Sequence, residues 1–176
     1  MHDISLYLLD IIENSTAAGS TIISIKIEID SDADLFRFVV DDNGRGLGTG
    51  PAEVMSPFYT TKPHKRVGLG LSLLQAAAEQ ADGSMTIGPS ATLEGVRVEV
   101  RMRLSHIDRP PVGDPASTIS TMMSAHPDVE FRACFQGEGR TLNFNTRRDI
   151  DSADPVTASM EAYRILRSRM PCCEYL

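Results

Sequence analysis

Residues 35–46 read Leu-Phe-Arg-Phe-Val-Val-Asp-Asp-Asn-Gly-Arg-Gly, and this stretch decides how the rest of the chain is interpreted. Alternation predicts a strand over 35–41 that ends where the glycines stop any regular element. Counting by twos places Asp42 on the face of Phe36, Phe38 and Val40. A carboxylate at the end of an apolar stripe needs a partner that offsets its desolvation, and the amino group of a ligand would serve. The alternative is that Asp42-Asn43-Gly44 forms only a turn and has no role in binding.

The flanking residues predict an α+β arrangement. Upstream, 21–29 alternates as a half-buried strand, and residues 3–18 have the apolar spacing of an amphipathic helix that Gly19 ends. Downstream, mostly irregular residues lead to a helix expected over 70–82, which Gly83 ends. Two strands follow at 84–88 and 96–104. The order is therefore helix, strand, strand, loop, helix, strand, strand.

A Pro-rich connector over 105–113 separates this section, residues 1–104, from a small addition over 114–176. Two Asp-Pro pairs each offer an N-cap followed by proline at the first helical position, so helices should start near 115 and 155. Alternation between them predicts two strands. We expect an α-β-β-α addition that packs on or beside the first section.

Composition narrows the class of protein. The 176 residues suit one domain with an appendage, and 41% apolar residues exclude disorder. With 17 Lys and Arg against 24 Asp and Glu, the net charge is −7, which argues against a nucleic-acid-binding surface. No apolar run is long enough to span a bilayer, and the N-terminus lacks the features of a signal peptide. We therefore expect a cytoplasmic protein with no membrane partner; its three cysteines are expected to be reduced.

Asp10 and Asn14 lie four residues apart, so they share one face of the first helix, whereas Glu13 points elsewhere. A carboxylate and an amide oxygen at this spacing suit hydrated Mg²⁺: Asn14 supplies one hard oxygen, and Asp10 orients a water or accepts its proton. The alternative is an ordinary polar edge of an amphipathic helix.

Gly68-Leu69-Gly70-Leu71-Ser72 opens the second helix. Glycines there bare backbone N–H groups at the positive end of the helix dipole, which favours phosphate; packing glycines at a helix start are the alternative. Just upstream, Lys62, His64, Lys65 and Arg66 concentrate positive charge, either for a ligand or as a solvated loop.

Four segments taken in order, LLDIIENSTAAG, DDNGRGL, PFYTTKP and GLGLS, resemble the boxes of the GHKL superfamily, which includes DNA gyrase, the ninety-kilodalton chaperones, sensor histidine kinases and mismatch-repair ATPases. The resemblance covers about residues 3–104 and is closest to the ATP-binding domain of sensor histidine kinases and to anti-sigma-factor kinases. It implies a two-layer α/β sandwich, the Bergerat or histidine kinase-like ATPase fold, with ATP bound between its layers.

The resemblance also implies roles for individual residues. Asn14 matches the asparagine that ligates magnesium, and Asp42 matches the aspartate that binds the adenine amino group. Gly44 and Gly46 would pack under the base, and Gly68, Gly70 and Leu71 would border the triphosphate. Lys62 and His64 could contact phosphate. Asp10 stands where hydrolysing and anti-sigma members carry a glutamate as general base, and it is one methylene shorter.

Three functions follow as expectations. The first is an ATP- and magnesium-dependent kinase that phosphorylates a partner protein, because the first helix starts almost at Met1 and leaves no room for a phosphoacceptor hairpin. The second is a nucleotide-gated protein-binding module with little turnover, which the shorter Asp10 and a short segment between Pro63 and Val67 favour. The third is a slow ATPase that forms a homodimer.

Overall fold

The computed structural model describes residues 3–47 and 69–170. Within these ranges the helices and strands follow the predicted order, with a short extra helix before the last one. Their bounds are α1 Ile4–Ala17, β1 Ile22–Asp30, β2 Leu35–Asp42, α3 Leu69–Gln80, β3 Ser84–Pro89, β4 Val96–Arg103, α4 Pro115–Ala125, β5 Glu130–Gly137, β6 Arg140–Asn145, α5 Thr146–Asp149 and α6 Pro155–Arg169.

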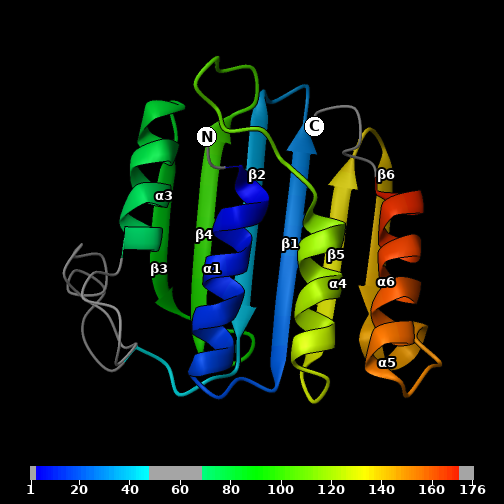
Figure 1. Ribbon diagram of the computed structural model, residues 1–176. Helices are drawn as coiled ribbons and strands as arrows, with labels where there is room; N and C mark the ends of the chain where they lie inside the picture. Colours follow the sequence, from blue (N-terminus) through cyan, green and yellow to red (C-terminus); the bar gives the residue numbers. More distant parts are fainter. Residues whose placement is uncertain (1–2, 48–68, 171–176) are drawn as a thin grey trace.

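The strands form one six-stranded sheet in the order β3-β4-β2-β1-β5-β6. All neighbours are antiparallel except β1 and β5, which run parallel. The long helices cover one face of this sheet (Figure 1). The predicted α+β sandwich of two layers is therefore confirmed, and the α-β-β-α addition continues the same sheet.

The core lies between the sheet and the helices, because every strand turns one set of alternate residues toward them. The four isoleucines of β1 at positions 23, 25, 27 and 29 are at most 4% exposed. They face Phe36 and Phe38 of β2 across one ladder and Phe131 and Phe135 of β5 across the other. The sheet therefore has a continuous apolar inner face from the first section into the addition.

The outer face of the sheet carries charged side chains that pair with one another. Arg37, Arg97 and Arg101 all contact Glu99 at 2.9–3.0 Å. These hydrogen bonds lower the pKa of Glu99 to about 2, and the bond from Arg37 has the largest effect. The network lies over Val39, which is only 3% exposed although it points to this outer face.

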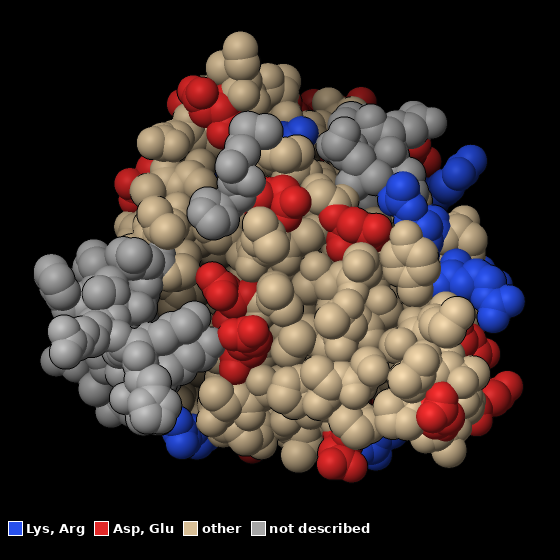
Figure 2. Space-filling model, in the orientation of Figure 1, with Lys and Arg blue, Asp and Glu red and all other residues tan. Residues whose placement is uncertain are grey.

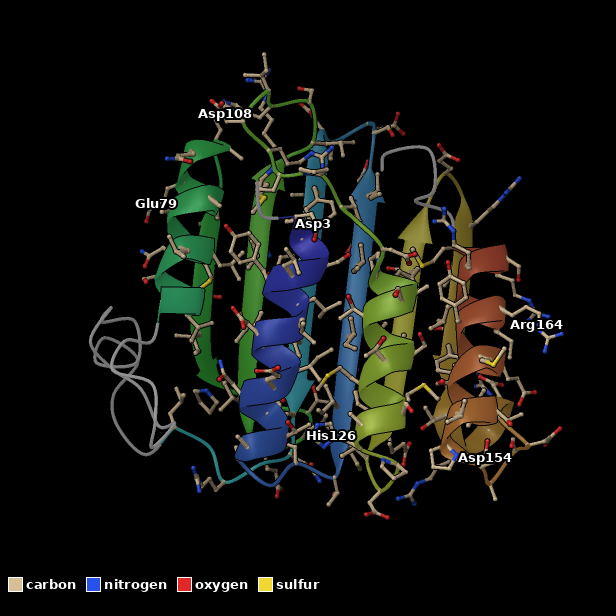
Figure 3. All side chains as sticks on the ribbon, in the orientation of Figure 1. Asp3, Glu79, Asp108, His126, Asp154 and Arg164 are labelled. Carbon is tan, nitrogen blue, oxygen red and sulfur yellow. The ribbon has the colours of Figure 1, made fainter. Side chains whose placement is uncertain are left out.

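The start of α1 is held by the connector and by α4. Asp3 caps the helix by accepting the Leu6 N–H at 2.9 Å, and it lies at the upper end of α1 in Figure 3. The N–H groups of residues 4 and 5 donate to the carbonyls of Pro111 and Val112. The Thr118 hydroxyl of α4 donates to the Ser5 carbonyl at 3.3 Å. Helix α1 is thus anchored by residues that follow β4.

The end of α3 differs from the prediction in one respect. The Gly83 N–H caps the helix by donating to the Ala78 carbonyl at 2.8 Å, but the residue in the left-handed conformation is Asp82, with φ of 52°. Gly83 is needed for another reason, because a Cβ there would overlap the Arg101 carbonyl of β4. None of the helices in residues 3–47 and 69–170 combines the length and hydropathy of a membrane span.

Candidate functional site

Asp42 ends β2 beneath the C-terminal half of α1, and it is 4% exposed. Its Oδ1 accepts the Gly44 N–H at 2.9 Å and the Val96 N–H at 3.1 Å. Its Oδ2 accepts the Ser15 hydroxyl at 2.6 Å. Two backbone donors and one hydroxyl therefore fix the orientation of the carboxylate, and Oδ2 keeps one lone pair for a further donor.

The residues after Asp42 are packed onto the turn between α1 and β1. Asn43 Oδ1 accepts the N–H groups of Thr21 and Ile22, both at 2.8 Å. A Cβ at Gly44 would lie 2.6 Å from Ser20 Oγ, and Gly46 has φ of 77°, which only glycine adopts without strain. Gly44 therefore brings bare backbone against Ser20, and Gly46 takes a conformation that favours glycine.

The turn between β3 and β4 closes over Asp42 from the other side. The Gly95 N–H donates to the Asp42 carbonyl at 3.1 Å. A Cβ at Gly95 would overlap both that carbonyl and Oδ1 of the same residue. The close approach that lets Val96 reach Asp42 therefore requires glycine at position 95.

Asp10 and Asn14 lie one turn apart on α1, beside the start of α3. A Cβ at Gly70 would lie 2.8 Å from Asp10 Oδ2, so α3 begins directly against this half-buried carboxylate. Asn14 is exposed. Neither side chain donates or accepts a hydrogen bond with another residue of the described ranges. Both are therefore available to a ligand next to the positive end of the α3 dipole.

This arrangement fits a magnesium ion held mainly by phosphate and water. Residues 3–47 and 69–170 contain no group of three His, Cys, Asp or Glu side chains that could hold a metal by themselves. Asn14 offers one hard oxygen, and Mg²⁺ is commonly bound through one or two protein oxygens together with substrate phosphates. Helix α1 has two acidic residues and no Lys or Arg, and acidic side chains lie over it in Figure 2. A polyphosphate bound there thus needs a cation that offsets the repulsion.

Several predicted site residues lie outside the described residues, namely Lys62, His64 and Gly68. Leu71 is described, and it is half-buried against the hydrophobic core. The structure thus brings Asp42 together with Gly44, and Asp10 together with Gly70, at two ends of one segment of α1.

Sequence reasoning missed Ser15, which is the donor closest to Asp42. A signal was present, because Ser15 continues the helical stripe of Leu8, Ile11 and Ile12. A hydroxyl in an apolar stripe must find a buried partner. The pairing of that hydroxyl with a residue 27 positions later had no local signal.

Three solved structures are similar to this chain, and the first of them shows the fold. The N-terminal domain of a DNA repair protein matches with a TM-score of 0.54 and 10% identity, over 93% of this chain and 57% of that one. The chain thus spans little more than half the length of that relative. A mycobacterial sensor histidine kinase, MprB, matches with a TM-score of 0.40 and 19% identity, over 55% of this chain and 66% of its own. The MutL ATPase domain of Aquifex aeolicus, solved with ADP, matches with a TM-score of 0.47 and 15% identity, over 93% of this chain and 70% of that one.

Comparison of the sequence itself identifies the family. No curated protein is significantly similar in sequence. The family model described as histidine kinase-, DNA gyrase B- and HSP90-like ATPase matches residues 3–106, more than half of the chain and all the elements that form the site. The chain therefore belongs to the histidine kinase-, DNA gyrase B- and HSP90-like ATPase family, the GHKL superfamily, and it is an ATP-binding protein.

Proposed function

We propose that the chain binds ATP with Mg²⁺ and transfers the γ-phosphate to a partner protein. Asp42 accepts the adenine amino group, Gly44 and Gly46 lie against the base, and the phosphates extend toward α3. Asn14 is the protein ligand of the magnesium, and Gly70 and Leu71 border the triphosphate.

One observation carries this assignment. Consecutive residues of α1 serve the two ends of the site: the Ser15 hydroxyl orients Asp42 at 2.6 Å, and Asn14 is exposed with no hydrogen bond to the described residues. A single rigid helix therefore fixes the separation between the base and the metal, which is what transfer chemistry requires of a positioned nucleotide.

Asp10 has the role of general base in this proposal. It lies one turn before Asn14 and against the start of α3, where a γ-phosphate would be reached. The acceptor oxygen or nitrogen of the partner attacks the γ-phosphorus, the bond to the β–γ bridging oxygen breaks, and ADP leaves. Asp10 accepts the proton that the acceptor loses. Magnesium neutralises charge on the phosphates when it is bound.

The experiment is labelling by γ-labelled ATP with Mg²⁺ in a cell extract, using the full chain. We expect one discrete labelled partner. Asp10→Asn should keep the ATP affinity within about threefold of wild type, because this carboxylate does not contact the adenine. The variant should lower the rate of phosphoryl transfer by about 10²-fold, because it lacks the general base. Intact ATP binding with no labelled product would contradict the transfer step while leaving nucleotide binding standing.

A second function, a nucleotide-gated binding module, is favoured by the anchoring of α1. The helix that carries Asp10 and Asn14 also donates to Pro111 and Val112 and accepts from Thr118. Nucleotide contacts on α1 therefore act on an element that packs against α4 of the addition. Pull-downs with ATP, with ADP and without nucleotide test this module; capture of the same partners in all three would refute it.

A further inference from the structure

Two consecutive aspartates at the end of β2 point to opposite faces of the sheet, and both reach the turn between β3 and β4. Asp42 faces the site, whereas Asp41 lies on the outer face with Arg37 and Val39. Asp41 is 8% exposed although it belongs to the open face. The proposed function gives Asp42 a role but leaves this second buried carboxylate without one.

Asp41 is linked to this turn by a hydrogen bond with Ser90. Its Oδ1 accepts the Ser90 hydroxyl at 2.7 Å, and its Oδ2 accepts from Arg97 at 2.8 Å. Ser90 Oγ in turn accepts the N–H groups of Thr92 at 3.3 Å and Leu93 at 3.1 Å. Ser90 thus donates its hydroxyl hydrogen to Asp41 and accepts two N–H groups of the turn with its lone pairs. The hydroxyl is therefore fully hydrogen-bonded, and the turn is closed around it.

The same turn delivers the donor that orients Asp42. The Ser90 N–H donates to the Gly95 carbonyl at 2.9 Å, which closes the segment at its base. The next residue, Val96, donates its N–H to Asp42 Oδ1 at 3.1 Å. A displacement of this turn by a few tenths of an ångström therefore alters the hydrogen bond that holds the site carboxylate.

We propose that Asp41 and Ser90 are positioning residues for recognition of the nucleotide base. They hold the turn over 90–95 from the outer face of the sheet, so that the Val96 N–H fixes Asp42 with Oδ2 directed at the base. This inference rests on the proposed contact between Asp42 and the adenine amino group. It adds a determinant of base specificity that lies on the face of the sheet opposite the nucleotide.

The test compares ATP with an analogue that has hydrogen in place of the 6-amino group, purine riboside triphosphate, by calorimetry with Mg²⁺ on the full chain. The ratio of the two affinities isolates the base contact, because the triphosphate is common to both ligands. A partial loss of folded protein does not change this ratio. We expect wild type to prefer ATP by about tenfold or more, the value of one hydrogen bond to a charged group.

Ser90→Ala and Asp41→Asn should each lower that ratio by a factor of about 3 to 10, because Asp42 loses its fixed orientation. Affinity for the analogue should change little. Ser90→Thr keeps the hydroxyl and should restore the ratio. The matched control is Arg101→Ala, which removes a side chain that is 57% exposed on the outer face of β4 and that pairs with Glu99. It should leave the ratio unchanged.

A second measurement needs no nucleotide. Hydrogen exchange of the Val96 amide should become faster in Ser90→Ala than in Arg101→Ala, because the turn that holds this amide is released. Unchanged exchange, or a preference for ATP that survives intact in both Ser90→Ala and Asp41→Asn, would overturn the inference alone. A wild-type ratio near one would instead refute the adenine contact of Asp42, and this inference with it.

Discussion

Replacing Asp42 by asparagine should separate folding from nucleotide binding, because the hydrogen bonds of Asp42 determine which way the new amide points. Oδ1 accepts two backbone N–H groups, from Gly44 and Val96, so the carbonyl oxygen of asparagine must remain there. The amide nitrogen then takes the place of Oδ2. Ser15 Oγ, 2.6 Å away, can rotate its hydrogen and accept from that nitrogen. The variant therefore keeps its three contacts, and we expect it to fold.

The same reasoning gives the loss of affinity. In the proposed complex of the wild type, the adenine amino group donates to the charged Oδ2, an interaction of about 1.5 to 3 kcal/mol. In Asp42→Asn it meets a second donor, which removes that bond and leaves a buried N–H unsatisfied for about a further 1 to 3 kcal/mol. The sum, about 2.5 to 6 kcal/mol, corresponds to an affinity lower by about 10²- to 10⁴-fold. The free energy of unfolding should fall by only about 1 kcal/mol.

The assay is calorimetric titration of ATP with Mg²⁺, with thermal unfolding measured on the same samples. Asp128→Asn is the matched control, because it makes the same chemical change at an exposed position. We expect the control to bind as wild type does. If Asp42→Asn binds ATP as tightly as wild type while remaining folded, the adenine amino group does not contact this carboxylate, and the assignment of the base end of the site is wrong.

Three further perturbations test the neighbouring geometry. Gly95→Ala should destabilise the protein by about 3 kcal/mol or more in thermal or denaturant unfolding, because its Cβ overlaps the Asp42 backbone, whereas Gly88→Ala in the same hairpin meets nothing within 4 Å and should be nearly neutral. Gly70→Ala should leave the melting temperature unchanged or higher, since alanine favours helix by up to about 1 kcal/mol, yet lower phosphoryl transfer by displacing Asp10. Glu99→Gln should remove stability that is fully present above pH 4.5 and lost as the pH falls through about 2, because the folded pKa of Glu99 is depressed below its ordinary value. After allowance for solvent screening, we expect the free energy of unfolding of wild type to exceed that of the variant by about 1 to 2 kcal/mol at pH 7 and by less in acid. Urea titrations that give a constant difference across pH 2–7 would contradict this expectation.

The elements were predictable because their signals are local. The apolar spacing of α1 and the alternation of β1 lie within single elements, and the structure places these elements within two residues of the expected bounds. Asp42 was found for the same reason, since period two alone puts it on the inner face of β2. A pattern inside one element reports which face of that element is buried.

Contacts between distant elements were not predictable from such patterns. The Oδ2 partner of Asp42 is 27 residues earlier, and the partner of Asp41, Ser90, is 49 residues later. Gly83 illustrates the same limit: its identity indicates a helix end, yet the reason for glycine is the Arg101 carbonyl of another strand. Sequence spacing predicts which residue types a site contains, whereas the orientation of each side chain depends on partners that only the assembled sheet brings near.

The parallel pairing of β1 with β5 is a contact between distant elements that supports the proposed nucleotide site. Without β5, strand β1 would have a free edge of unpaired backbone N–H and C=O groups. The start of α1 would also lose the Pro111 and Val112 carbonyls that accept its first N–H groups. Both α1 and β1 therefore depend on residues after β4, and α1 carries the side chains assigned here to phosphate and metal. None of the described residues of the connector and the addition, 105–170, is assigned to the proposed nucleotide site. They act on that site by holding in place the helix on which Asp10, Asn14 and Ser15 are spaced.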